Sequence, residues 1–232
     1  VRMNGHEVIL SSIDADTYSG NASGDVRFMI SPKSDEKTRY SVKVAVKDAD
    51  FQKIAIAMGN SAETDISGTL SGDISISGFA GDKSAESIDG EGSIRIKDGR
   101  VFALPLFGGF SSTMSKIIPG LDFVLRQTEA KTDFVIAQSK AHTDKVVIEG
   151  DVLSLSGNGD YRFDGNLDFE IQVKLMKGHT LVAKILRTLT YPISMLFEYR
   201  LKGNITEPIW YPVNFSKDLL EKIGLIKEKD DS

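Results

Sequence analysis

Hydrophobic residues recur at every second position along most of the chain, which is typical of β-strands that expose one face and bury the other. The clearest positions are Tyr40, Val42, Val44, Val46, Leu70, Ile74, Ile76, Ile94 and Ile96. The residues between them are mostly small or polar. This periodicity predicts a mainly β fold in which strands outnumber helices.

Residues 146–175 contain three such runs, separated by Asn158-Gly159 and Asp164-Gly165. Both dipeptides favour the positive φ angles of tight hairpin turns, so this stretch predicts a β-meander. A further hairpin is expected at Asp98-Gly99, after which residues 101–106 should return as an antiparallel strand. Residues 81–87 are rich in small polar residues and are interpreted as a hairpin loop within one extended sheet.

The meander should have one apolar and one solvated face, as antiparallel sheets often do. The side chains expected on its apolar face are Leu153, Leu155, Tyr161, Phe163, Leu167, Phe169, Ile171, Val173 and Leu175. Serines and charged residues alternate with them. An uncovered apolar face is costly in water, so either a second sheet or acyl chains should cover this one.

Helices are expected to be few and peripheral. The first follows Asp50 as its cap, the second spans residues 111–118, the third spans 179–189, and the last begins at Ser216. The expected fold is thus an elongated, curved antiparallel sheet, groove-like or a sandwich, with three or four short peripheral helices. Residues 1–215 should form a single domain, and residues 216–232 a helix with a charged tail.

The composition indicates a globular protein that does not bind nucleic acid. The 232 residues are 41% hydrophobic and 26% charged, with a formal net charge of -5. The chain has no cysteine, which excludes disulfides and thiolate chemistry. No apolar run is long enough to span a bilayer, and no signal sequence opens the chain. Because the sequence starts at Val1, we expect a targeting segment upstream.

Candidate catalytic chemistry is sparse. His6, His142 and His179 lack the spacing of metal ligands, and no Gly-x-Ser-x-Gly elbow is present. The carboxylates, including Asp160 and Asp164, fit turn and cap positions better than a glycosidase pair. Gly157-Asn-Gly-Asp160 has one copy of a calcium-repeat-like motif, whereas such repeats occur in arrays. We therefore predict no catalytic residue, no metal and no cofactor.

Several segments within roughly residues 40–215 carry motifs of glycine and apolar residues. They include a strand, an Asp-Gly turn and a Leu-Pro-Leu step in residues 92–110, then Thr132-Asp-Phe134. The others are Gly157-Asn-Gly-Asp-Tyr161, the glycine-spaced strand at residues 66–78, and the closing Gly-to-Pro-aromatic segment in residues 199–210. Together these motifs resemble the C-terminal region of the AsmA family over roughly residues 40–215.

This resemblance implies a membrane-anchored protein on the periplasmic side of the bacterial inner membrane, concerned with outer-membrane biogenesis. Larger relatives are proposed to carry lipids along an apolar β-groove. We therefore expect phospholipid acyl chains as partners, lined by Leu153, Leu155, Tyr161, Phe163, Phe169, Ile171 and Val173. The alternative is a structural or scaffold domain that binds another envelope protein, for instance by strand addition at a sheet edge.

Overall fold

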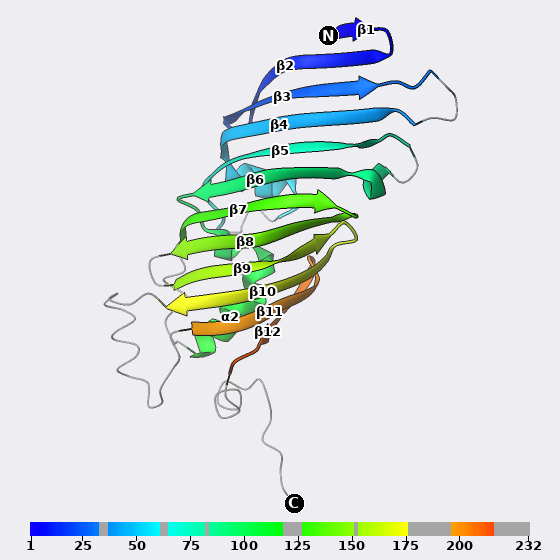
Figure 1. Ribbon diagram of the computed structural model, residues 1–232. Helices are drawn as coiled ribbons and strands as arrows, with labels where there is room; N and C mark the ends of the chain where they lie inside the picture. Colours follow the sequence, from blue (N-terminus) through cyan, green and yellow to red (C-terminus); the bar gives the residue numbers. More distant parts are fainter. Residues whose placement is uncertain are drawn as a thin grey trace, which may run out of the picture.

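In the described part of the chain, twelve strands form one antiparallel sheet, in which each strand pairs with the next along the chain (Figure 1). The computed structural model describes residues 1–32, 37–60, 65–81, 84–117, 127–150, 153–175 and 196–215. The strands are β1 (Arg2–Asn4), β2 (Glu7–Thr17), β3 (Gly20–Met29), β4 (Arg39–Asp50), β5 (Thr69–Phe79), β6 (Asp89–Lys97), β7 (Gln127–Ala137), β8 (Lys140–Gly150), β9 (Leu153–Arg162), β10 (Asn166–Leu175), β11 (Leu196–Asn204) and β12 (Glu207–Pro212). The predicted mainly β class is confirmed, as one open sheet.

The described residues include two α-helices, which lie on the same side of the sheet, behind it in Figure 1. Helix α1 (Phe51–Ala57) starts where predicted, because the Asp50 carboxylate accepts a hydrogen bond from the Lys53 backbone N–H at 3.1 Å. Helix α2 (Gly108–Ile117) starts three residues earlier than residue 111. The helices expected at residues 179–189 and from residue 216 lie outside the described residues.

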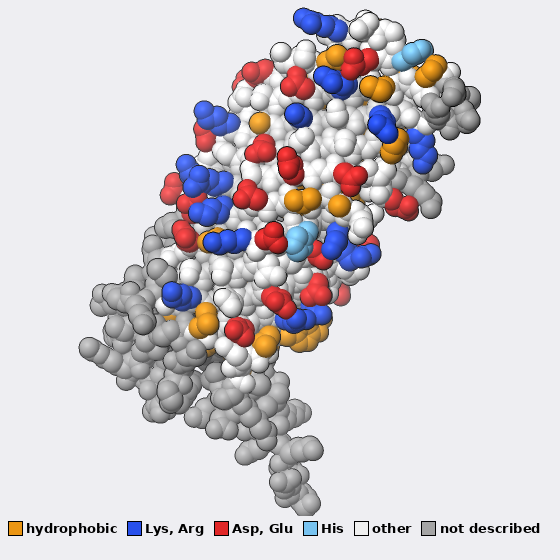
Figure 2. Space-filling model, in the orientation of Figure 1, with side chains coloured by type: hydrophobic (Ala, Val, Ile, Leu, Met, Phe, Trp, Pro, Cys, Tyr) orange, Lys and Arg blue, Asp and Glu red, His pale blue; other side chains and the backbone are white. Residues whose placement is uncertain are grey.

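The pairing register places all charged strand residues of the described part of the chain on one face. The opposite face, here called the apolar face, is uncharged from β2 to β12. A representative row of neighbours across it is Val44, Ile74, Gly92, Phe134, Thr143, Gly159, Phe169, Leu201 and Trp210, with a bulge in β8. Figure 2 shows the other face, which is studded with acidic and basic side chains.

The two rims of the sheet differ. At the tight-turn rim, short turns at Gln138-Ser139, Phe163 to Gly165 and Ile205-Thr206 join the C-terminal strands. At the opposite rim, longer connections leave β4 and β6 and contain α1, α2 and the 3-10 turns η2 (Val101–Ala103) and η3 (Pro105–Phe107). A further 3-10 turn, η1 (Ser84–Ser87), lies between β5 and β6. Helices α1 and α2 and the turns η2 and η3, which are the described segments over the apolar face, thus all enter from this opposite rim.

The hydrophobic core lies between helix α2 and the C-terminal strands. Phe110 and Met114 of α2 are fully buried. The Phe110 ring centroid lies 5.1 Å from that of Trp210 and 5.7 Å from that of Tyr199. The Tyr199 hydroxyl contacts the Met114 sulfur at 3.3 Å. Burial raises the pKa of Tyr199, which accordingly stays neutral.

Two predicted hairpins were wrong. After β6, residues 101–107 form the consecutive 3-10 turns η2 and η3, so β6 pairs with β7 instead of a returning strand. Adjacent Val101 and Phe102 are both buried, whereas a strand would point them to opposite faces. Asn158-Gly159 lies inside the unbroken strand β9, and the turn at Asp164-Gly165 is the one that forms.

Candidate apolar binding site

Helix α2 and the turns η2 and η3 together form the cover of the apolar face. A cavity of about 350 Å³ opens in this face where the cover ends. Leu106, Phe107 and Trp210 form its wall on the side of the cover. The sheet contributes Ile94, Phe134, Val146, Ile148, Leu155, Tyr161, Leu167, Phe169, Ile171 and Leu201. The cavity also reaches Ile205 in the turn after β11, so it extends to the tight-turn rim.

Glycines hollow out the surface beneath this cavity. The Phe134 ring lies across Gly92, and a Cβ there would be 2.6 Å from the Phe134 ring. The Phe169 ring covers Gly159 in the same way, with a Cβ at 2.7 Å from the ring carbon Cγ. These contacts explain why glycines occupy strand interiors, where they are otherwise unfavourable. The rings lie low against the sheet and leave room above them.

The structure brings together four of the seven residues expected to line a lipid site. Leu155, Tyr161, Phe169 and Ile171 all line the cavity. Leu153 and Val173 belong to the buried core. Phe163 lies in the turn after β9 and is 36% exposed, outside the cavity lining.

Other lining residues were missed by the sequence prediction. Ile94 and Phe134 are on β6 and β7, whose alternation was visible but whose position beside the meander was not. Leu106 was assigned to a returning strand and Phe107 follows it directly, so their position over the apolar face was not expected. The Leu104-Pro105 step is the signal that could have placed them, because proline suits the first position of a helical turn.

Most polar side chains in the cavity have partners within the protein. Thr132 and Thr143 share a hydroxyl–hydroxyl hydrogen bond of 2.8 Å. The Thr143 hydroxyl also accepts the backbone N–H of Lys145 at 3.1 Å, in the β8 bulge. The Trp210 indole N–H donates to the Leu106 carbonyl at 2.8 Å. These bonds leave an interior that is effectively apolar.

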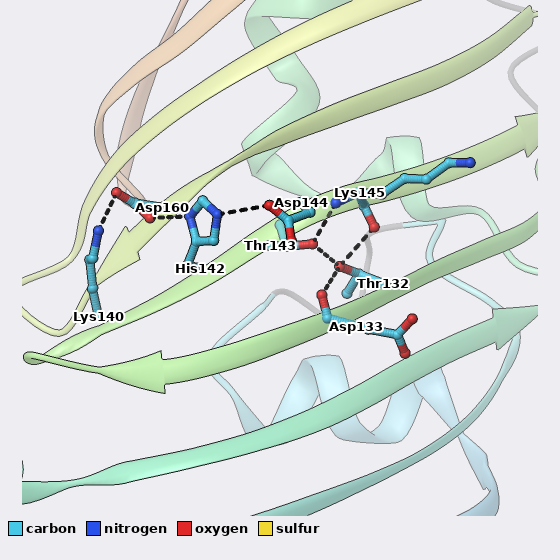
Figure 3. Close-up of polar contacts among 8 residues, drawn as sticks. All are labelled: Thr132, Asp133, Lys140, His142, Thr143, Asp144, Lys145 and Asp160. Atoms are coloured by element: carbon cyan, nitrogen blue, oxygen red, sulfur yellow. Dashed lines mark hydrogen bonds and ion pairs between the residues drawn. The ribbon is translucent and has the colours of Figure 1, made fainter.

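A polar network lies on the outer face of the same strands (Figure 3). The Lys140 ammonium and the His142 Nδ1 both contact the Asp160 carboxylate, at 2.9 Å and 2.6 Å. His142 Nε2 lies 3.3 Å from Asp144. The hydrogen bond to Asp160, reinforced by Asp144, raises the pKa of His142, and the hydrogen bond from Lys140 lowers the pKa of Asp160.

The described residues contain no cluster of three or more His, Asp or Glu side chains arranged to hold a metal ion. Within the same residues, no helix is both long and apolar enough to cross a membrane. The cavity is lined almost wholly by apolar side chains, and glycines and aromatic rings shape it.

Comparison with known proteins gives no match to a family model, a curated protein or a solved structure. The AsmA resemblance remains a prediction from the sequence motifs.

Proposed function

We propose that this chain is a non-catalytic envelope domain of the AsmA type that holds or guides lipid acyl chains in outer-membrane biogenesis. In this proposal it works on the periplasmic side of the bacterial inner membrane, as part of a membrane-anchored protein. The observation that carries the proposal is the apolar face, which runs uncharged across β2 to β12 and contains the cavity.

The size of this face supports an extended apolar ligand. Neighbouring strands are about 4.8 Å apart, so a sheet of twelve strands is roughly 50 Å across. Apolar surface left in water costs about 25 cal/mol per Å². Val42, Val44, Ile74 and Ile76 are only partly buried, so a ligand that covered them would be stabilised by their burial.

The charge distribution supports the same ligand. A protein or nucleic-acid partner usually meets a surface that mixes apolar and charged groups. Here the charged strand residues lie on the outer face, including cross-strand pairs such as Asp168 with Lys202. An acyl chain is a partner that needs contact area and no charge.

Native mass spectrometry with lipid extraction tests the proposal, on protein purified from a bacterial host. We expect co-purifying phospholipid in the wild type and its loss in Phe169→Asp, because the new carboxylate would stand unpaired in the cavity. Phe169→Leu is the matched control and should keep the lipid. Wild-type protein that is lipid-free after mild purification would overturn the proposal.

The second candidate is a scaffold domain that binds an envelope protein by strand addition. Strand β1 pairs only with Glu7 to Ile9, so the outer edge of β2 beyond that point has no partner among the described residues. The other edge of the sheet, at β12, is less suited to strand addition. The Val213 N–H donates to the Glu198 carbonyl of β11 and therefore points into the sheet. Because N–H groups alternate in direction along a strand, positions 208 and 212 face outward, and Pro208 and Pro212 have no N–H to donate to a further strand. Lipid-free protein that co-purifies with an envelope protein would favour this candidate.

A further inference from the structure

Tyr161 carries the one hydroxyl among the described lining residues of the cavity that has no hydrogen-bond partner in the protein. The hydroxyls of Thr132 and Thr143 bond each other, and the Trp210 N–H bonds the Leu106 carbonyl. Both ring nitrogens of His142 contact aspartates on the outer face. Among the described residues, the Tyr161 hydroxyl has no hydrogen-bond partner, although the side chain is half-buried in the cavity wall.

The position of Tyr161 suits a ligand that is apolar along its length and polar at one end. It is the penultimate residue of β9, next to the tight-turn rim, and its strand neighbours are Ala141 and Leu167. Ile205 marks the same end of the cavity and is partly exposed. Tyrosine often lies at such boundaries, with its ring in apolar surroundings and its hydroxyl toward a polar group.

The charges around the cavity indicate which polar group of a ligand it would accept. Among the described residues no lysine or arginine lines it, and the nearby Lys140 and Arg162 pair with Asp160 and Asp164 on the outer face. A free fatty-acid carboxylate would enter this apolar site without a counter-ion, at a large desolvation cost. A neutral ester carbonyl needs only one hydrogen-bond donor, which the Tyr161 hydroxyl supplies.

We propose that Tyr161 is a specificity-determining residue that donates a hydrogen bond to the ester carbonyl of a bound acyl lipid. The proposal rests on the proposed lipid-binding function and adds the part of the lipid that is recognised. It predicts that ester-linked lipids bind more tightly than ether-linked lipids of equal chain length, which lack the carbonyl.

The single tryptophan of the chain provides the measurement, because Trp210 lines the cavity. Phosphatidylcholine with brominated acyl chains is titrated from detergent micelles, and quenching of Trp210 fluorescence reports binding. The matched ligand is the ether-linked dialkyl lipid with the same bromination. One net hydrogen bond corresponds to about a two- to twelve-fold difference in affinity, and we expect about five-fold in favour of the ester.

Tyr161→Phe should bind the ester lipid as weakly as the ether lipid, with ether binding unchanged. Tyr211→Phe is the control, because Tyr211 is an exposed residue of β12 outside the cavity lining, and it should keep the wild-type preference. A wild type without ester preference, or a preference that persists in Tyr161→Phe, overturns the role of Tyr161 and leaves lipid binding intact. Absence of quenching by both lipids overturns the proposed function, and the role of Tyr161 with it.

Discussion

The two ends of the sheet share the same alternation of apolar and polar residues but differ in what lies against the apolar face. In the covered half, β9 to β12, Leu155, Val173 and Tyr199 are almost completely buried beneath helix α2 and the 3-10 turns. In the open half, β2 to β5, Val44 and Ile74 occupy equivalent face positions and are only partly buried. Helix α1 packs at one end of β4 and buries Phe51 and Ala55 there.

This difference teaches that alternation alone decides which face is apolar, while the size of the side chains and the cover decide whether that face becomes core. The covered half has leucines and aromatic residues that interlock with Phe110 and Trp210. The open half has mainly valines, isoleucines, alanines and glycines, which are smaller. The covered half therefore forms the core, the open half keeps a partly exposed apolar face, and the cavity lies on β6 to β12 where the cover ends.

The largest expected effect separates the two halves directly. Val173→Asp places a carboxylate at a fully buried position, which should cost about 4 kcal/mol or more and leave little folded protein. Val44→Asp places the same group on the open half, where water can reach it, so the loss should be below about 1.5 kcal/mol. Urea unfolding followed by circular dichroism measures both. Equal losses would contradict the division into a covered and an open half.

An intermediate effect is expected at Gly92, on β6 between the two halves. A Cβ there would lie 2.5 Å from the Asp73 carbonyl oxygen, so the backbone of β5 would have to move. We expect Gly92→Ala to lower the free energy of unfolding by about 1–3 kcal/mol. Gly108→Ala is the control, because a Cβ at this helical residue has nothing within 4 Å and should be neutral or slightly stabilising. Unchanged stability in Gly92→Ala would contradict the close packing of β5 against β6 at this position.

Much of the fold was predictable because its main determinant is local. The period-two pattern identified β4, β9 and β10 and their shared apolar face, and Asp164-Gly165 marked the turn between the last two. Asn158-Gly159 was wrongly interpreted as a turn. Gly159 is required for packing, because the Phe169 ring of the neighbouring strand covers it. A turn dipeptide and a glycine required by a cross-strand aromatic ring look identical in the sequence.

The candidate site was predictable only in part, because it joins elements that are distant in the chain. Leu155, Tyr161, Phe169 and Ile171 followed from one alternating segment. Trp210 and Leu106 meet through a hydrogen bond across 104 positions, and no local pattern indicates that contact. The free hydroxyl of Tyr161 also emerges only when the partners of the other polar groups are known.

The smallest expected effect concerns the outer face, and it tests whether the cover accounts for the stability of the covered half. His142 and Asp160 form a partly exposed pair on β8 and β9, with side chains 45% and 31% exposed. The His142 pKa is raised above its ordinary value of 6.5, so its contribution is complete below pH 6.5 and is lost as the pH rises through the raised pKa. Because salt and water screen such pairs, the contribution should stay below about 1 kcal/mol.

An NMR titration of the His142 ring should give a pKa above 6.5 in the wild type, and a lower one in Asp160→Asn, which removes the largest cause of the shift. Urea unfolding of His142→Gln at pH 5.5 and pH 8 should show a small loss at the lower pH and almost none at the higher. A loss comparable to that of Val173→Asp would mean that the outer polar network, rather than the cover, stabilises this half of the sheet.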